Sequence, residues 1–220
     1  MSSQFFFDPR DPRTSKQWTP EFPISPSVRA FGFYPNLQDL LPADLILVSN
    51  IKPNFSHKII EKVQLLGGYS QDDARWHHAA IYVGDAHICE ADLPGVECRI
   101  IERYLTGSHL IRVRRDMSLS IEQRWRIAIR SLTRLRQRYA FEYLLDLGKL
   151  ALSGFGQLSP DQTRLPEKAK ICSQLYADAY SPITGKVLQN LRSGEITPAF
   201  LSFTNQLTDV PVEWLKIEKF

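Results

Sequence analysis

Apolar residues after position 40 first gather in short runs, each about the length of a β-strand and bounded by turn-forming residues. Gly84, Asp85 and Ala86 separate two of these runs, as is typical of a β-hairpin. Because the runs follow one another with short connections, we expect an antiparallel sheet. The predicted strands cover residues 44–48, 76–83, 87–91, 96–101 and 110–113, and a closing strand is expected at 212–217.

Other stretches repeat their apolar residues every three or four positions, which is the period of an amphipathic helix. Shorter helices are predicted at 56–68, which ends in a glycine pair, and at 171–180, which ends before Pro182. Another helix should begin within 196–199. The pattern favours an α+β fold in which an antiparallel sheet packs against helices. The longest helical stretch, 119–147, has an expected buried face made of Ile121, Trp125, Ala128, Leu132, Leu135 and Tyr139.

Residues 1–39 differ from the rest of the chain in having six prolines among many aromatic side chains. Prolines interrupt regular elements, whereas aromatic residues argue against a disordered segment. We therefore predict an extended N-terminal arm over 1–39 that packs on a folded domain at 40–220. The arm is either a structural brace or a lid or recognition segment over a functional site.

Composition excludes several classes of protein. A hydrophobic content of 43% in 220 residues is enough for a large core, and a net charge of +3 is low for a dedicated nucleic-acid-binding protein. Zinc-finger, P-loop and helix-turn-helix spacings are absent, so specific nucleic-acid binding is not expected. Three cysteines at irregular spacing argue against a disulfide framework and against a CxxC metal pair. We expect neither a metal site nor a cofactor.

The N-terminal residues lack the basic and apolar regions of a secretory signal peptide. No run approaches the roughly 18 apolar residues that a membrane-spanning helix needs. We therefore expect a protein without a transmembrane segment that is cytoplasmic as synthesised. A role outside the producing cell, as a secreted effector or toxin, would require a specialised export route.

Cys172 is the candidate nucleophile. It follows a polar loop at 153–168 and lies at the start of the predicted helix, where the helix dipole and unpaired N–H groups stabilise a thiolate. Cys89 and Cys98 lie within apolar strand runs, so we expect both to be small buried core residues. A buried structural role is also the plain alternative for Cys172.

His78 is the candidate base, because the hairpin can place it beside a carboxylate. A two-residue loop would set His78 opposite Ala91 and turn Glu90 to the other face of the sheet. A three-residue loop at 84–86 would instead pair Ala80 with Glu90, so that His78 and Glu90 share a face at roughly 7–8 Å. We prefer the second register.

Two other carboxylates compete with Glu90 for this role. Asp92 would stand directly opposite His78 in the preferred register, and Glu97 lies on the following strand. A solvated charge is the plain alternative for Glu90 itself. The joint pattern of a histidine in an apolar strand, a carboxylate across the hairpin and a cysteine after a polar loop indicates a Cys-His-Glu triad.

These residues resemble the circularly permuted branch of the NlpC-type, papain-like peptidases, a superfamily that also includes lecithin:retinol acyltransferase-like enzymes. The resemblance covers residues 40–203. It departs from the usual pattern at four places, where Pro42-Ala43, Ala80, Cys89 and Gln174 replace more common residues, and none of these removes a catalytic group. The matching segments are 42–47 for the opening strand, 78–85 for the histidine strand, 87–91 for the carboxylate strand, 172–175 for the nucleophile helix and 196–199.

The resemblance implies a permuted papain-like catalytic domain in which Cys172, at a helix N-terminus, is the nucleophile, His78 the base and Glu90 the third polar residue. Tyr82 and His77 are candidate donors to an oxyanion or to substrate. The implied activity is that of a thiol hydrolase that forms a thioester acyl-enzyme, first of all from an amide such as a peptide or cell-wall peptide. A lipid acyl hydrolase or acyltransferase with the same triad, and an inactive papain-like binding module, are the alternatives.

Arginines recur every four residues in the stretch 119–147, at Arg126, Arg130, Arg134 and Arg138. The plain interpretation is the solvated face of an amphipathic helix. The alternative is a docking surface for anionic lipid headgroups, an acidic partner protein or nucleic acid.

Overall fold

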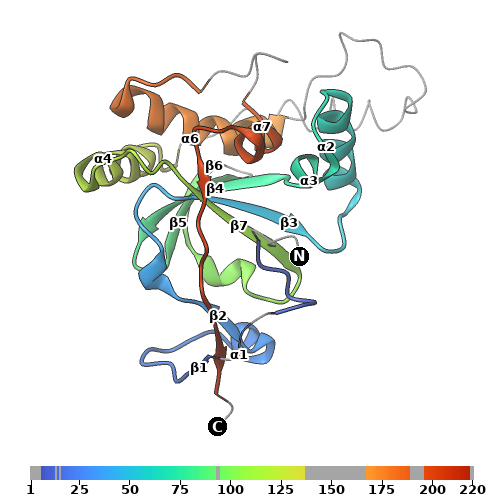
Figure 1. The fold of residues 1–220 in the computed structure, drawn as a ribbon, viewed down its shortest axis with the longest axis vertical. Helices are drawn as coiled ribbons and strands as arrows, with labels where there is room; N and C mark the ends of the chain where they lie inside the picture. Colours follow the sequence, from blue (N-terminus) through green and yellow to red (C-terminus); the bar gives the residue numbers. More distant parts are fainter. Residues whose placement is uncertain are drawn as a thin grey trace.

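The computed structural model describes residues 6–12, 14, 16–92, 95–136, 167–188 and 196–218. Its centre is a six-stranded antiparallel sheet with the strand order β6-β5-β4-β3-β7-β8, which crosses the middle of Figure 1. The predicted antiparallel sheet is therefore present. Its strands are β3 (Leu45–Asn50), β4 (His78–Gly84), β5 (His87–Asp92), β6 (Gly95–Ile100), β7 (His109–Arg115) and β8 (Thr208–Asp209).

Helices lie along one side of this sheet, the upper side in Figure 1. The helix α6 packs on β4 and β5, and both α4 and α7 contact α6. The side chain of Gln64 connects its own helix to two other parts of the chain. Its amide N–H groups donate to the Ala74 and Trp76 carbonyls, and its amide oxygen accepts from the Ala199 N–H. The helices are α2 (Phe55–Leu66), α3 (Gln71–Ala74), α4 (Ile121–Leu132), α6 (Glu167–Thr184) and α7 (Pro198–Phe203).

Both faces of the central sheet are buried. Leu45 and Leu47 of β3 point into the core beneath the helices, whereas Ile46 and Val48 point into a second core on the opposite face. Alternation of side chains along a strand explains this division. Burial on both faces also explains why the strands read as continuous apolar runs rather than as alternating ones.

The N-terminal arm is tied to the end of the chain by a second, three-stranded sheet with the order β1-β9-β2. This small sheet lies below the central one in Figure 1. Phe7 adds a backbone bridge to Ile111 of β7. The elements involved are β1 (Gln17–Trp18), α1 (Pro26–Phe31), β2 (Phe33–Pro35), η1 (Leu37–Asp39) and β9 (Trp214–Ile217).

The β4-β5 hairpin has the predicted register but not the predicted loop. Ala80 pairs with Glu90, as expected. The turn, however, contains two residues, Asp85 and Ala86, both with positive φ, and a β-bulge before Gly84 supplies the extra residue. A bulge shifts the register by one residue, which is the same effect as a longer loop, so the two predictions could not be separated by parity alone.

Two helices differ from their predictions. Helix α6 begins at Glu167 rather than at 171, so Cys172 lies in its second turn, and Pro182 lies inside the helix. Residues 167–170 are Glu, Lys, Ala and Lys, all strong helix formers, which explains the earlier start. The cysteine is therefore not at the helix N-terminus that we predicted.

Helix α4 is rotated relative to the predicted buried face. Ile121 and Trp125, expected inside, are more than 40% exposed, while Arg124 is buried. Arg124 donates to the Asp116 carbonyl and its guanidinium lies 3.7 Å from the Asp44 carboxylate. These polar contacts turn the helix. The helix also ends at Leu132, earlier than predicted, and Arg136 has a positive φ. Residues 137–147 of the predicted stretch, with Arg138 and Tyr139, lie outside the described residues.

Candidate active site

The β4-β5 hairpin brings His78 and Glu90 together. His78 is the first residue of β4, and its Nε2 donates to Glu90 Oε2 at 2.9 Å. Glu90 has no exposed surface and His78 is 8% exposed. The pairing of Ala80 with Glu90 produces this contact, because it places the two side chains on one face of the sheet.

Two residues of the short helix η2 (Ile101–Tyr104) complete the surroundings of Glu90. The Tyr104 hydroxyl donates to Glu90 Oε2 at 2.6 Å, and the Arg103 guanidinium donates to Glu90 Oε1. Arg103 also lies 3.7 Å from Asp92, so this rival carboxylate is paired with an arginine. Neither residue was predicted from the sequence. Both follow the hairpin along the chain, and no local pattern indicates that they fold back onto Glu90.

The network determines the charges of Glu90 and His78. Burial alone would raise the pKa of Glu90, but the hydrogen bonds from His78 and Tyr104 and the charge of Arg103 lower it overall. Burial alone would lower the pKa of His78, but its hydrogen bonds with Cys172 and Glu90 raise this pKa to about 10. An ionised carboxylate and a readily protonated imidazole therefore lie side by side.

Cys172 reaches the same imidazole from helix α6. The side chains of Cys172 and His78 are hydrogen-bonded, and the thiol is 1% exposed. Because Nε2 of the ring donates to Glu90, Nδ1 is the nitrogen left to face the sulfur. The field of a helix dipole falls off beyond the first turn, so the imidazole rather than the helix end is the group that can carry positive charge beside this thiol.

The other two cysteines lie away from this group. Cys89 is buried in β5 and burial raises the pKa of its thiol to about 11, as expected for a core residue. Cys98, which we predicted to be buried, is exposed. It lies toward the end of β6, the edge strand of the sheet, where Arg99 and Ile100 are exposed as well.

Tyr82 and His77, the candidate donors, are engaged elsewhere. The Tyr82 hydroxyl accepts from the Ala86 N–H in the hairpin turn. His77 Nε2 accepts from the Asn50 N–H, and the ring stacks on His57 at 4.0 Å. We therefore assign no part to them in the chemistry below.

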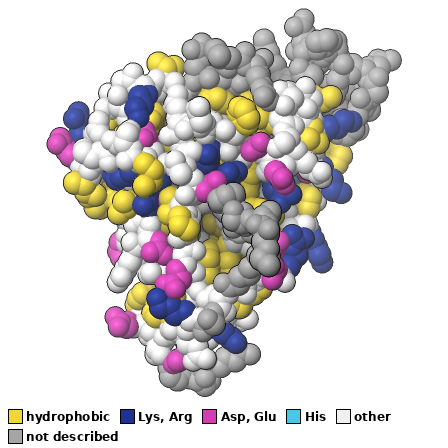
Figure 2. Space-filling model, viewed as in Figure 1, with side chains coloured by type: hydrophobic (Ala, Val, Ile, Leu, Met, Phe, Trp, Pro, Cys, Tyr) yellow, Lys and Arg dark blue, Asp and Glu magenta, His cyan; other side chains and the backbone are white. Residues whose placement is uncertain are grey.

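Three arginines of the predicted basic series are described, and each has an acidic or carbonyl partner. Arg126 lies 3.9 Å from Glu122, Arg130 donates to the Asp178 carbonyl, and Arg134 lies 3.9 Å from the Asp178 carboxylate. Figure 2 shows hydrophobic side chains beside basic ones at the left of the molecule, where Figure 1 places α4. A partner for this surface stays a prediction.

Comparisons with known proteins bear on the fold. No protein-family model matches the chain, and no curated protein matches it. A solved structure, described as metalloprotein YiiX from Escherichia coli O157:H7, matches with a TM-score of 0.51 and 18% identity, over 80% of this chain and 99% of that one. The chain shares the fold of YiiX. The predicted α+β class, an antiparallel sheet packed against helices, is thereby confirmed.

The description as a metalloprotein applies to YiiX. Whether a metal fits the present chain depends on its own side chains. Within the described ranges, no three His, Cys, Asp or Glu side chains are grouped so that they could hold a metal ion. We derive no metal-dependent step. None of the helices in these ranges has the length and apolar character that spanning a membrane requires.

Proposed function

We propose that this protein is a cysteine hydrolase with Cys172 as nucleophile, His78 as base and Glu90 as the residue that orients the base. The observation that carries the proposal is the His78 ring, hydrogen-bonded to Cys172 on one side and to the Glu90 carboxylate, at 2.9 Å, on the other. A thiol, a base and an orienting carboxylate in a chain form the arrangement needed for nucleophilic catalysis.

The reaction has two halves. His78 accepts the proton of the Cys172 thiol, and the sulfur attacks the acyl carbon of the substrate to form a tetrahedral oxyanion. The oxyanion collapses, the leaving group takes the proton from His78, and a thioester remains on Cys172. His78 then takes a proton from water, the hydroxide attacks the thioester, and the carboxylic acid departs while the thiol recovers its proton.

Amides such as peptides are the proposed substrate class. An amine leaves only after protonation, so amide cleavage needs an acid more than ester cleavage does. The Glu90 carboxylate, 2.9 Å from Nε2 of His78, supports the imidazolium that delivers this proton. The same triad directed at lipid esters is the alternative that the substrate assay distinguishes.

Burial of the thiol constrains the mechanism. With Cys172 1% exposed, substrate has to displace neighbouring side chains before it can reach the sulfur. A papain-like module that binds a partner without turnover would need no such opening. The reactivity of the thiol therefore decides between a hydrolase and a binding module.

The decisive experiment uses the chain's own exposed cysteine as a reference. Purified protein is treated with limiting iodoacetamide at neutral pH, and the rates at Cys172 and Cys98 are compared by peptide mass spectrometry. We expect Cys172 to react faster than Cys98, and His78→Ala to abolish this advantage. Labelling of Cys172 no faster than Cys98 in the unsubstituted protein, together with no turnover of any substrate in the panel below, would favour the binding module.

Turnover is tested in parallel on a panel of peptides, peptidoglycan fragments and phospholipid vesicles, scored by mass spectrometry. Cys172→Ala should lower the rate about 10³-fold or more, as removal of a catalytic nucleophile does. Cys98→Ala is the matched control and should leave the rate unchanged. Equal activity of the two alanine variants would refute the assignment of Cys172.

A further inference from the structure

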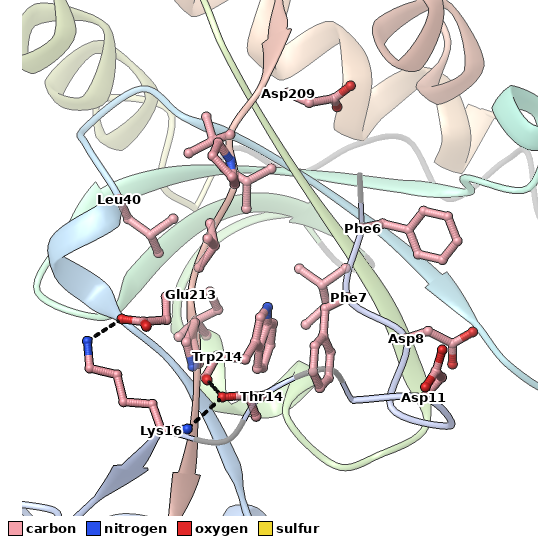
Figure 3. A pocket seen from close by; sticks show the side chains of 17 residues that line it. Phe6, Phe7, Asp8, Asp11, Thr14, Lys16, Leu40, Asp209, Glu213 and Trp214 are labelled. Atoms are coloured by element: carbon pink, nitrogen blue, oxygen red, sulfur yellow. Dashed lines mark hydrogen bonds and ion pairs between the residues drawn. The ribbon is translucent and has the colours of Figure 1, made fainter. Parts of the chain in front are cut away.

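A cavity of about 620 Å³ lies between the N-terminal arm, strand β7 and the segment at 209–214 (Figure 3). Much of its wall comes from residues 6–16 and 209–214, which lie outside the part of the chain that resembles papain-like peptidases. Its volume is within the range of small-molecule binding pockets. The proposed hydrolase chemistry makes no use of this cavity.

The floor of the cavity is apolar. It is formed by Leu40, Ile101, Ile111 and Val113, all of which are buried by the rest of the protein. Branched aliphatic side chains of this kind present methyl groups and no hydrogen-bonding atoms. The floor therefore favours a ligand that binds by loss of apolar surface from water.

Two of the three aromatic rings in the wall, those of Phe7 and Trp214, are closed on each other, and Phe6 is the third. Phe7 and Trp214 stack with their ring centroids 3.5 Å apart and their planes 15° from parallel, as Figure 3 shows. A flat aromatic ligand cannot enter between rings that already stack. Aliphatic side chains outnumber these aromatic ones in the lining, which includes Leu40, Ile101, Ile111, Val113, Val210 and Val212.

Charged groups at the mouth are paired with one another or with neighbours. Lys16 lies 2.7 Å from Glu213, and Asp209 lies 2.6 Å from the guanidinium of Arg112. Asp8 accepts from Arg10, and these contacts lower the pKa of its carboxyl below the usual value. The mouth therefore carries polar groups suited to contact with water or a polar headgroup, whereas the interior offers no counter-charge.

We propose that this cavity binds the aliphatic chain of an amphiphile, with the chain on the apolar floor and the polar end at the mouth. The chain would lie on the same face of the sheet as His78 and Glu90, because Ile111 pairs with Val48 and Val48 with His78. Helix η2 connects the two regions, with Ile101 in the floor and Tyr104 on Glu90. Binding requires no reaction at Cys172.

The test measures binding of dansyl-labelled undecanoic acid by fluorescence, with dansylglycine as the probe that lacks the chain. We expect the long-chain probe to bind and dansylglycine to bind far more weakly. Within a series of shorter dansyl-labelled acids, each methylene removed should weaken binding about fourfold. Equal affinity for all members of the series would overturn the proposal, and this arm needs no variant.

The location is tested by Val212→Trp, which fills the cavity from its half-buried wall, with Val187→Trp as the same substitution at an exposed position. Val212→Trp should weaken the long-chain probe about fifteenfold, the effect of displacing two methylenes, while Val187→Trp should not. Near-ultraviolet circular dichroism checks that both variants are folded. Unchanged binding in folded Val212→Trp would place the probe elsewhere.

Binding and catalysis are separated by repeating the assay on Cys172→Ala. The proposal expects the same affinity as in the unsubstituted protein, whatever the outcome of the turnover assay. Loss of binding in this variant would show that the probe occupies the thiol site instead, and would contradict the cavity assignment.

Discussion

Two carboxylates of this protein, Glu90 and Asp44, have no exposed surface, and both contact arginine. Their surroundings act in opposite directions. Burial raises the pKa of Asp44 in spite of two hydrogen bonds from Arg115 at 2.6 and 2.7 Å. The pKa of Glu90 is lowered, because hydrogen bonds from His78 and Tyr104 add to the charge of Arg103 and outweigh burial.

The two carboxylates differ in what their hydrogen-bond partners connect. Asp44 accepts from the Leu41 N–H and from Arg115 at the end of β7, and it lies near Arg124 of α4, so its contacts join structural elements. Glu90 accepts a hydrogen bond from one ring nitrogen of His78, and the same ring interacts with the Cys172 thiol. A buried carboxylate thus serves architecture in one region and, in the proposed triad, orients a base in the other.

The largest expected effect is on the structural member of the pair. Asp44→Asn leaves Arg115 and Arg124 without their buried counter-charge and should lower the free energy of unfolding by about 3–5 kcal/mol. Urea unfolding measures this. Asp72→Asn, at a largely exposed carboxylate paired with Arg75, is the control and should cost less than about 1 kcal/mol. Similar costs for the two variants would remove the structural half of the comparison.

The second effect separates charge from shape at the site. Glu90→Gln keeps the size of the side chain but removes the charge that supports the His78 imidazolium. The pKa of His78, about 10 in the intact network, should fall, as followed by NMR of the ring, and turnover should fall about 10²–10⁴-fold. An unchanged His78 titration in this variant would mean that Glu90 does not orient or stabilise the base.

The pKa shifts of Glu90 and His78 also determine how the stability of Glu90→Gln depends on pH. The lowered pKa of Glu90 contributes stability above pH 4.5 that is lost as the pH falls, and the raised pKa of His78 contributes stability below pH 6.5 that is lost toward pH 10. Glu90→Gln should therefore destabilise most between pH 4.5 and 6.5, with a smaller difference near pH 10. Urea unfolding within this pH window and again near pH 10 measures the change in the free energy of unfolding.

The smallest effect concerns a residue that acts through another. Tyr104→Phe removes one hydrogen bond to the Glu90 carboxylate and should cost about 1.5–3 kcal/mol of stability. It should also raise the pH at which the His78 ring titrates, followed by NMR, because a carboxylate without the phenol's hydrogen bond attracts the imidazolium more strongly. A purely structural residue would not change this titration. Tyr176→Phe is the control, because the buried Tyr176 hydroxyl has no hydrogen-bond partner among the described residues. Identical His78 titrations for both variants would limit Tyr104 to packing.

Local patterns predicted much of the fold because they report local geometry. The register that pairs Ala80 with Glu90 was predicted from parity, and it is present. The predicted three-residue loop was wrong. A bulge before Gly84 and a three-residue turn shift the register by the same amount, so parity could not distinguish them. Parity identifies the face of a strand on which a side chain lies, but not the device that sets it.

Predictions of burial failed where a distant partner decided the outcome. Trp125 fits the apolar period of α4 yet is exposed, and Arg124 is buried because Asp44 and the Asp116 carbonyl receive it. Cys98 fits an apolar run yet is exposed, because β6 is an edge strand. Strand order and ion pairing are properties of the assembled chain.

By itself, the sequence determined the order of strands and helices, the face on which His78 and Glu90 lie, and the choice of Cys172 as the candidate thiol. These follow from periodicity and residue chemistry, which act over a few positions. The tertiary structure alone decided that the thiol meets the imidazole, that Arg103 and Tyr104 enclose Glu90, and that two ends of the chain line a cavity. Such contacts depend on how the elements pack, and packing is settled by the whole chain at once.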